Sequence, residues 1–228
     1  VGYDWRSFEY FYWRRGITLS NPYLVQINKK ETNELLVSFR AFAKQNDVPI
    51  ITYEGLQFLV QVIKLRGIKK VLEIGTAIGY SSIAMTLKTD VEITTIERNE
   101  AMVELAKDNI KRANMEERIT VIHQDALEVD ESSLGQFDLI FIDAAKSQSI
   151  KFFEKYETLL TEKGVIVTDN LLFHDLFNQE VRDRNLKQLL RKIDTFNKYV
   201  VEKEGYSTYI YTLGDGMSLS IKEWDPWK

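Results

Sequence analysis

The sequence contains no cysteine and only two histidines among its 228 residues. The absence of cysteine excludes disulfide bonds, thiolate metal sites and cysteine nucleophiles. Any metal site in this chain must therefore use oxygen ligands, with or without one of the two histidines. Oxygen ligands favour hard cations such as Mg²⁺ over soft metals.

Long apolar runs are also missing. No hydrophobic stretch approaches the ~20 residues that a membrane-spanning helix requires, and the N-terminus lacks the basic-then-apolar order of a secretory signal. We therefore expect no membrane partner and a cytoplasmic location. The net charge of −4 and the pI of about 5.4 argue against a generally basic nucleic-acid-binding surface, although a local basic face is compatible with them.

The composition that is present is that of an ordinary globular protein, with 44% hydrophobic and 28% charged residues and no internal repeat. We expect one domain over residues 1–228, with a helical extension at 1–47 and the core at 48–228. Seven aromatic residues fall between positions 3 and 13 without a clear period. Residues 1–16 therefore fit a docking arm, a partner-facing segment or sequence added to the natural chain.

The N-terminal part of the chain shows a helical pattern. Asn21-Pro22 has the chemistry of a helix start, and apolar residues then recur at helical spacing as far as Ala43. Residues 46–49 break this pattern, and residues 55–65 resume an apolar helix. Arg66-Gly67 is typical of a helix end.

From residue 70 onward, short apolar strands alternate with helices. We expect strands at 71–74, 91–96, 119–122, 137–142 and 165–168, and helices at 80–87, after the cap residue Asn99, and near 181–203. The last two strands are nearly continuous apolar runs, as expected of parallel strands covered on both faces. Residues 206–213 and 217–223 then predict an antiparallel hairpin with a tight turn at Gly214-Asp215-Gly216.

This pattern predicts the α/β fold class, with a doubly wound, Rossmann-like sheet that is mostly parallel and ends in an antiparallel hairpin. Gly75 and Gly79 lie where the first strand turns into its helix, which is the ligand-binding corner of such folds. A tight turn needing glycine only for packing explains the pair equally well. Glu97 ends the second strand, about where these folds place an acid for ribose hydroxyls, and G-x-G-x-x-G is absent, which disfavours NAD.

Several blocks of the sequence carry a family resemblance. VLEIGTAIGYSS, TTIER, QDALE, DLIFIDAAK and GVIVTDNLLF resemble the class I S-adenosylmethionine-dependent O-methyltransferases of the catechol and caffeoyl-CoA type, over about residues 48–222. More narrowly, VPIITYEGLQFL, LEIGTAIGY, IERNE, FIDAAK and GDGMSLS resemble the bacterial tRNA 5-hydroxyuridine methyltransferases.

The resemblance implies S-adenosylmethionine as cofactor. The cofactor-binding residues that it implies, together with Gly75 of the turn, are Ile51, Ser81, Glu97, Asp125, Ala126 and Asp143. Ser81 opens a helix whose free N–H groups suit the methionine carboxylate, although an ordinary N-terminal serine explains it equally well. Gln124 stands where relatives often have glycine, which affects the backbone beside Asp125.

Asp143, Asp169 and Asn170 each follow a hydrophobic strand, so their oxygen atoms should converge on one edge of the sheet. Such a set suits Mg²⁺, which leaves positions for a substrate with two oxygens. Helix capping by Asp143 and a turn at Asp169-Asn170 are the alternatives. The resemblance further implies Lys146 as general base beside Asp143, where metal and burial would lower its pKa, whereas a solvated lysine at a helix start is an equal alternative.

The predicted reaction is transfer of a methyl group to one of two adjacent oxygens. Our first expectation for the acceptor, from the resemblance, is 5-hydroxyuridine in tRNA at the anticodon wobble position, acted on by a homodimer. The alternative is a catechol-like or caffeoyl-CoA-like small molecule, and a third is a non-catalytic binding module. For tRNA, Arg184, Lys187, Arg191 and Lys198 lie near one face of an expected helix, although a solvated amphipathic helix also explains them.

The two histidines are weak candidates. His123 should belong to the third strand as a satisfied or edge histidine, without a catalytic role. His174 lies in a loop after the proposed metal ligands, where a surface position is the simpler explanation.

Overall fold

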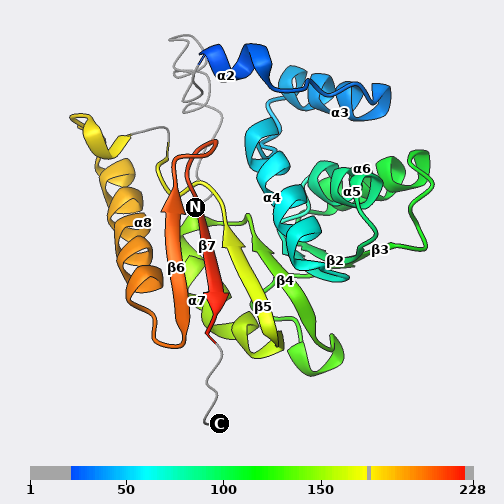
Figure 1. Cartoon of the computed structure of the whole chain (residues 1–228). Coiled ribbons are helices and arrows are strands. Elements are labelled where there is room, and N and C mark those ends of the chain that lie inside the picture. The colour runs from blue at the N-terminus through cyan, green and yellow to red at the C-terminus, as the bar shows by residue number, and fades with distance from the viewer. Residues whose placement is uncertain (1–21, 174–175, 224–228) are drawn as a thin grey trace.

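Strands form where the apolar runs were expected, and they assemble into one seven-stranded sheet in the order β3-β2-β1-β4-β5-β7-β6 (Figure 1). The computed structural model describes residues 22–173 and 176–223. The strands are β1 (Lys70–Ile74), β2 (Glu92–Glu97), β3 (Ile119–His123), β4 (Phe137–Ile142), β5 (Leu160–Thr168), β6 (Tyr206–Tyr211) and β7 (Met217–Lys222). Strands β1 to β5 run parallel to one another, and β7 runs antiparallel to both β5 and β6. This confirms the expected fold class.

Seven α-helices occur in the described part of the chain. They are α2 (Pro22–Ile27), α3 (Glu34–Gln45), α4 (Tyr53–Arg66), α5 (Tyr80–Lys88), α6 (Glu100–Arg112), α7 (Ser149–Tyr156) and α8 (Arg184–Glu202). Their ends follow local chemistry. The Asn99 side chain caps α6 by accepting the Met102 N–H, and Gly67 ends α4 in the left-handed conformation at φ 64°.

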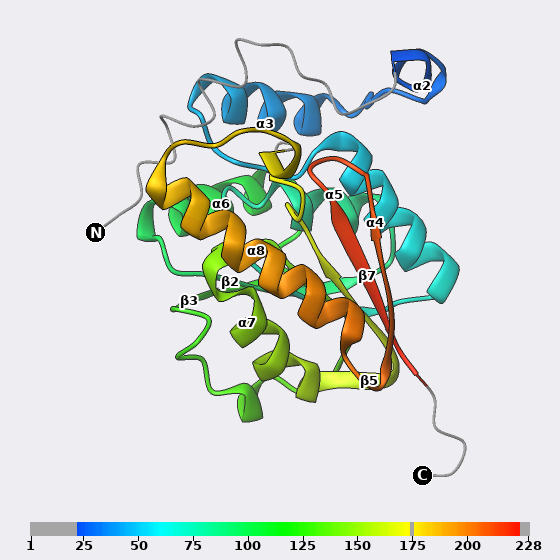
Figure 2. The same cartoon turned by 90° about the vertical axis from the view of Figure 1, so that its left-hand side faces the viewer.

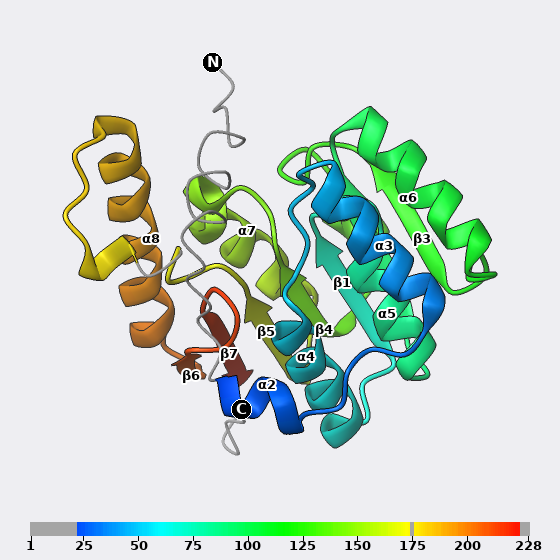
Figure 3. The same cartoon turned by 90° about the horizontal axis from the view of Figure 1, so that it is seen from above.

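Helices cover both faces of the sheet, as Figures 2 and 3 show. One core lies between the sheet and α3, α4, α5 and α6, and includes Phe39, Leu59 and Ile83. The other lies between the sheet and α7 and α8, and includes Phe153 and Phe196. The central strands are buried on both faces, which explains why they read as continuous apolar runs.

The N-terminal helical pattern divides into two helices. Helix α2 begins at Pro22 and ends at Ile27, and α3 begins only at Glu34, capped by the Asn33 side chain. Buried Leu36 and Phe39 join α3 to the main core, so this part of the expected extension packs against it. The boundary at residue 47 between extension and core stays a prediction, and residues 1–16, Asn21 and His174 lie outside the described residues. No described helix is both long and apolar enough to cross a bilayer.

Candidate active site

The carboxyl ends of β1, β4 and β5 lie side by side at one edge of the sheet (Figure 1). Backbone hydrogen bonds continue past the strand ends. The Asp143 N–H donates to the Ile74 carbonyl at 2.9 Å, and the Asp169 N–H donates to the Ile142 carbonyl at 3.1 Å. The structure therefore brings the two predicted acids together, on neighbouring strands.

Asp143 is the centre of a hydrogen-bonded cluster. Its Oδ1 accepts from Lys146 Nζ at 2.9 Å and from Asn170 Nδ2 at 2.9 Å. The side chains of Asp143 and Lys146 are 21% and 13% exposed. Asn170 adopts the left-handed conformation at φ 63°, which asparagine tolerates better than most residues. All four residues predicted for metal binding and proton transfer therefore occupy one place.

Asp169 is the most buried member of this cluster. It is 4% exposed, and its Oδ1 accepts the Asn170 N–H at 2.7 Å. Burial and then the negative charge of Asp143 raise the pKa of Asp169 to about 8, although Lys146 opposes the shift. Asp215, in the turn between β6 and β7, adds to the repulsion. The edge thus carries more acidic groups than the ammonium of Lys146 neutralises.

This shortage of positive charge fits a divalent cation. The donor set is two carboxylates and the Asn170 amide, and oxygen donors of this kind suit Mg²⁺. Among residues 22–173 and 176–223, no group of three or more histidine or acidic side chains forms a metal cluster. The set therefore depends on the Asn170 amide oxygen, which would have to turn toward the ion from an amide that now donates to Asp143. The metal-ligand role of the three residues stays a prediction.

Glu97 lies beside the glycine turn, as its position at the end of β2 suggested. Its Oε2 accepts the Ala77 N–H at 3.0 Å, and its Oε1 accepts the N–H groups of Arg98 and Asn99 at 2.9 Å each. These bonds hold the carboxylate against the turn that would contact a cofactor. A carboxylate has about four lone-pair sites, so it can also accept from ribose hydroxyls.

The glycines of the turn differ in what they require. Gly75 has φ 104°, and a Cβ there would lie 2.1 Å from the Asp143 carbonyl oxygen. Close packing of β1 against β4 is therefore sufficient to explain Gly75, whatever its role toward a cofactor. Gly79 has φ 79° and precedes α5, whose N-terminus has no side-chain cap. Uncapped N–H groups at this position suit an anion such as a carboxylate.

Ser81 has a partner that the sequence analysis missed. Its hydroxyl donates to Oε1 of Glu73 at 2.5 Å, and the Thr95 hydroxyl donates to Oε2 at 2.7 Å, with Ser82 as a third donor. Glu73 is completely buried, and burial raises its pKa to about 7 against the effect of these hydrogen bonds. The sequence did contain a signal for this buried hydrogen-bonded group, because Glu73 is an acidic residue inside the apolar strand VLEI.

The remaining predicted cofactor residues lie around the same edge. Asp125 follows β3, its Oδ1 accepts the Leu127 N–H at 2.9 Å, and its side chain is 32% exposed. Ala126 is buried, and its carbonyl accepts the Tyr156 hydroxyl at 2.5 Å. Ile51 is buried in the core just before α4. Their contacts with a cofactor stay predictions.

Two expectations away from this cluster can be compared with the structure. His123 belongs to β3, as expected; it ends the strand opposite Glu97 in the register, and its side chain is exposed. On α8, Arg184, Lys187 and Arg191 are exposed while Leu186, Leu190, Ile193, Phe196 and Val200 are buried. Lys198 forms an ion pair with Asp194 at 2.7 Å. The helix is therefore amphipathic with a partly neutralised basic face.

Comparisons with known proteins agree with this fold. The model of a protein family described as O-methyltransferase matches residues 26–223. The caffeoyl-CoA O-methyltransferase of Populus kitakamiensis is 30% identical over 174 residues, which cover 72% of this chain and 74% of the relative.

Solved structures are similar over most of their length. One from Staphylococcus aureus, provisionally described as a caffeoyl-CoA O-methyltransferase, has 39% identity and a TM-score of 0.80, covering 88% of this chain and 95% of that one. An O-methyltransferase from Bacillus cereus, solved with S-adenosylhomocysteine (SAH), has 23% identity and a TM-score of 0.74, covering 88% and 96%. At that identity, the second likeness concerns the fold alone.

Proposed function

The chain belongs to the O-methyltransferase family, and from this premise we propose that it methylates one of two adjacent oxygens on a catechol-like small molecule. Its enzyme class is S-adenosylmethionine-dependent O-methyltransferase. The observation that carries the proposal is the cluster in which Lys146 and Asn170 both bond to Oδ1 of Asp143 beside buried Asp169.

We assign the following roles to the residues of this site. Glu97 binds the ribose hydroxyls of the donor, and the uncapped start of α5 receives its carboxylate. Asp143, Asp169 and Asn170 would hold a divalent cation, whose positive charge would favour the ionised form of an acceptor oxygen. Lys146, as the neutral amine, would accept the acceptor's proton at Nζ and so become the ammonium that Asp143 binds at 2.9 Å. A short, fixed distance between acceptor and methyl group then favours in-line transfer.

A small-molecule acceptor now comes first, although our sequence analysis favoured tRNA. The relative from Populus is named for caffeoyl-CoA, and the structure from Staphylococcus aureus is described in the same terms. The tRNA acceptor remains a second candidate because Arg184, Lys187 and Arg191 expose a basic strip on α8. A homodimer and a cytoplasmic location stay predictions.

Methyl transfer assays test the proposal directly. Labelled S-adenosylmethionine should methylate catechol or caffeoyl-CoA only with Mg²⁺ or a similar cation, and Asp169→Ala should lower the rate at least about 100-fold. Asp108→Ala removes an exposed carboxylate on α6 and should leave the rate unchanged. Labelling of hydroxyuridine-containing tRNA alone would reject the small-molecule acceptor. Full activity of Asp169→Ala would reject the metal site.

The donor site can be tested separately by calorimetry. Glu97→Ala should weaken S-adenosylmethionine binding about 10-fold or more, because the ribose loses a charged acceptor. Glu92→Gln, at the exposed start of the same strand, is the control and should bind normally. An unchanged affinity in Glu97→Ala would discard the ribose assignment without affecting the metal site.

A further inference from the structure

The loop that follows β3 lies where the base of the donor would bind. The carboxylate of the donor is expected at the start of α5, which follows β1, and its ribose at Glu97, which ends β2. Strand β3 is the next strand beyond β2, and the Gln124 N–H donates to the Glu97 carbonyl at 3.0 Å. A donor extended across the ends of β1 and β2 would therefore bring its adenine to residues 125–129, which we call the β3 loop.

Every backbone carbonyl of the β3 loop accepts a hydrogen bond. The Glu128 N–H donates to the Asp125 carbonyl at 2.8 Å, and Gln124 Nε2 donates to the Glu128 carbonyl at 3.0 Å. These two donors belong to the loop and to the residue before it. The carbonyls of the other three residues accept from a different element, helix α7.

Helix α7 supplies these donors from its last two residues. The Tyr156 hydroxyl donates to the Ala126 carbonyl at 2.5 Å. Lys155 Nζ donates to the carbonyls of Leu127 and Val129, at 2.8 and 2.6 Å. Tyr156 is fully buried, and the Lys155 side chain is only 15% exposed. Hydrogen bonds from an ammonium are stronger than bonds between neutral groups, so α7 holds the shape of the loop.

The Asp125 carboxylate has room for a further hydrogen-bond donor. Its Oδ1 accepts the Leu127 N–H at 2.9 Å, its Oδ2 lies 3.5 Å from Arg98 Nη1, and its side chain is 32% exposed. A carboxylate has about four lone-pair sites, so Asp125 can also accept from the exocyclic amine of adenine. Where this carboxylate lies depends on the loop that carries it, and therefore on the bonds from α7.

We propose that Lys155 and Tyr156 are positioning residues for the donor, which fix the β3 loop so that Asp125 selects adenine by its exocyclic amine. This inference rests on the proposed function, because it requires that the chain bind S-adenosylmethionine. Both residues act through the loop and not by contact with the donor. A loop that is already ordered loses less conformational entropy when a ligand binds, so the bonds from α7 raise the affinity for the donor.

Calorimetry with two probes tests the inference. The probes are SAH and S-inosylhomocysteine, which carries a carbonyl oxygen in place of the adenine amine. The natural chain should bind SAH at least about 10-fold more tightly, because a carboxylate accepts from an amine but not from a carbonyl. Lys155→Met and Tyr156→Phe should each weaken SAH binding at least about 5-fold and reduce the preference for SAH. Tyr156→Phe keeps the buried ring, so it serves as the test if Lys155→Met does not fold.

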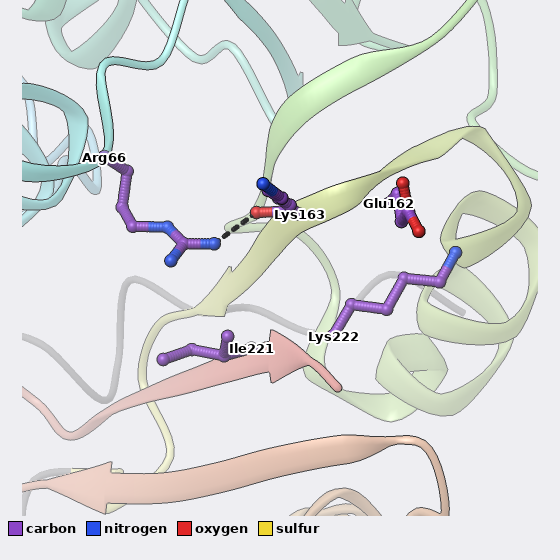
Figure 4. Close-up of a pocket in the computed structure, with 5 residues that line it drawn as sticks. All are labelled: Arg66, Glu162, Lys163, Ile221 and Lys222. Atoms are coloured by element: carbon purple, nitrogen blue, oxygen red, sulfur yellow. Dashed lines mark hydrogen bonds between the residues drawn. The ribbon is translucent and has the colours of Figure 1, made fainter. Parts of the chain in front are cut away.

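Two matched variants remove similar bonds far from the β3 loop along the chain. The Arg66 guanidinium donates to the Lys163 carbonyl in the pocket that Figure 4 shows, which lies by the first half of β5. Arg66→Met therefore removes another bond from a cation to a backbone carbonyl. Lys203 forms an ion pair with Glu157 at 2.8 Å and is 25% exposed, so Lys203→Met removes another partly buried lysine. Both controls should bind the two probes as the natural chain does.

Hydrogen exchange shows whether the loop itself is affected. The amide protons of residues 125–129 should exchange faster in Lys155→Met and Tyr156→Phe than in the two controls, because the loop loses its bonds to α7.

Three results would overturn the inference while the proposed function stands. They are SAH affinity in Lys155→Met and Tyr156→Phe equal to that of the natural chain, an equal loss of affinity in the controls, and equal binding of the two probes by the natural chain. A natural chain that binds neither probe would overturn the inference together with the proposed donor.

Discussion

Glu73 shows how a single residue escaped the sequence analysis. Its carboxyl group is completely buried and is held by the hydroxyls of Ser81, Ser82 and Thr95. Two of these donors come from α5 and one from β2, so only the tertiary structure shows that the acid is satisfied. The hydrophobic pattern of a strand shows that an acidic residue such as Glu73 is unusual there, but it does not show which side chains donate hydrogen bonds to it.

Replacing Glu73 by glutamine should change how stability depends on pH. Burial raises the pKa of Glu73 from 4.5 to about 7, so the folded chain keeps a proton that the unfolded chain releases. This contribution to stability is complete below pH 4.5 and is lost as the pH rises to about 7. The natural chain should therefore lose up to about 3 kcal/mol relative to Glu73→Gln across that window.

Urea unfolding between pH 5 and pH 8 measures this difference. Glu92→Gln changes an exposed acid on β2 and should follow the natural chain at every pH. Parallel stability curves for Glu73→Gln and the natural chain would show that Glu73 has an ordinary pKa.

Gly75→Ala should destabilise the chain by about 3 kcal/mol or more. The new Cβ would lie 2.1 Å from the Asp143 carbonyl oxygen, at a φ of 104° that alanine rarely adopts. Gly135→Ala is the control, because its φ is 76° but nothing lies within 4 Å of the new Cβ. The control should cost only about 1–2 kcal/mol. Chemical denaturation of both variants decides whether close packing or backbone strain dominates.

Among the secondary-structure elements, the hydrophobic pattern predicted the parallel strands well. It predicted the first part of β5 and the helix α7 less well. Phe137–Ile142 was predicted with its observed bounds, because every residue of the strand except Asp138 is apolar and buried. Strand β5 begins at Leu160, five residues before the expected start, because its first part bulges and carries polar residues. The eight-residue helix α7 is too short to give a periodic signal of its own.

The gap between α2 and α3 also depends on distant contacts. Glu31 accepts the N–H groups of Thr32 and Asn33, and it forms an ion pair with Lys88 of α5 at 2.7 Å. Local propensity could not show that this segment turns toward another helix. Nor could it show that β7 lies between β5 and β6, since strand order depends on how the hairpin docks.

Asn33→Ala should destabilise the chain by about 1 kcal/mol, because its Oδ1 caps α3 by accepting the Leu35 and Leu36 N–H groups at 3.1 Å. Hydrogen exchange should show the loss first in the opening turn of α3. Ser38→Ala changes a side chain that bonds within the helix and should have little effect. An equal loss of stability in the two variants would mean that the Asn33 cap does not stabilise α3.

For the whole molecule, Mg²⁺ should raise the unfolding temperature, and EDTA should reverse the effect. A ligand that binds only the folded chain stabilises it by mass action. Because Asp169 has a raised pKa of about 8, the ion competes with a proton, and its apparent affinity should strengthen from pH 7 to pH 9. Asp169→Asn should abolish the stabilisation, and Asp108→Asn should keep it. Stabilisation that survives Asp169→Asn would place the ion elsewhere.

The sequence was sufficient for the fold and for the meeting of Asp143, Asp169, Asn170 and Lys146, because strand ends in a parallel sheet share one edge. It was not sufficient for the acceptor. The residues that would surround an acceptor lie on loops and on the hairpin turn near Asp215, whose arrangement follows from packing and not from periodicity.

The contact between Gly75 and the Asp143 backbone has one more consequence. The turn at Gly75 that would contact S-adenosylmethionine packs directly against the main chain of Asp143, a proposed metal ligand. A change to either residue would therefore displace the other. Protein engineers who wish to broaden the range of acceptors should therefore leave this junction intact. Exchanging the segment after Asn170 or the turn at Gly214–Gly216 offers a safer route to new acceptors.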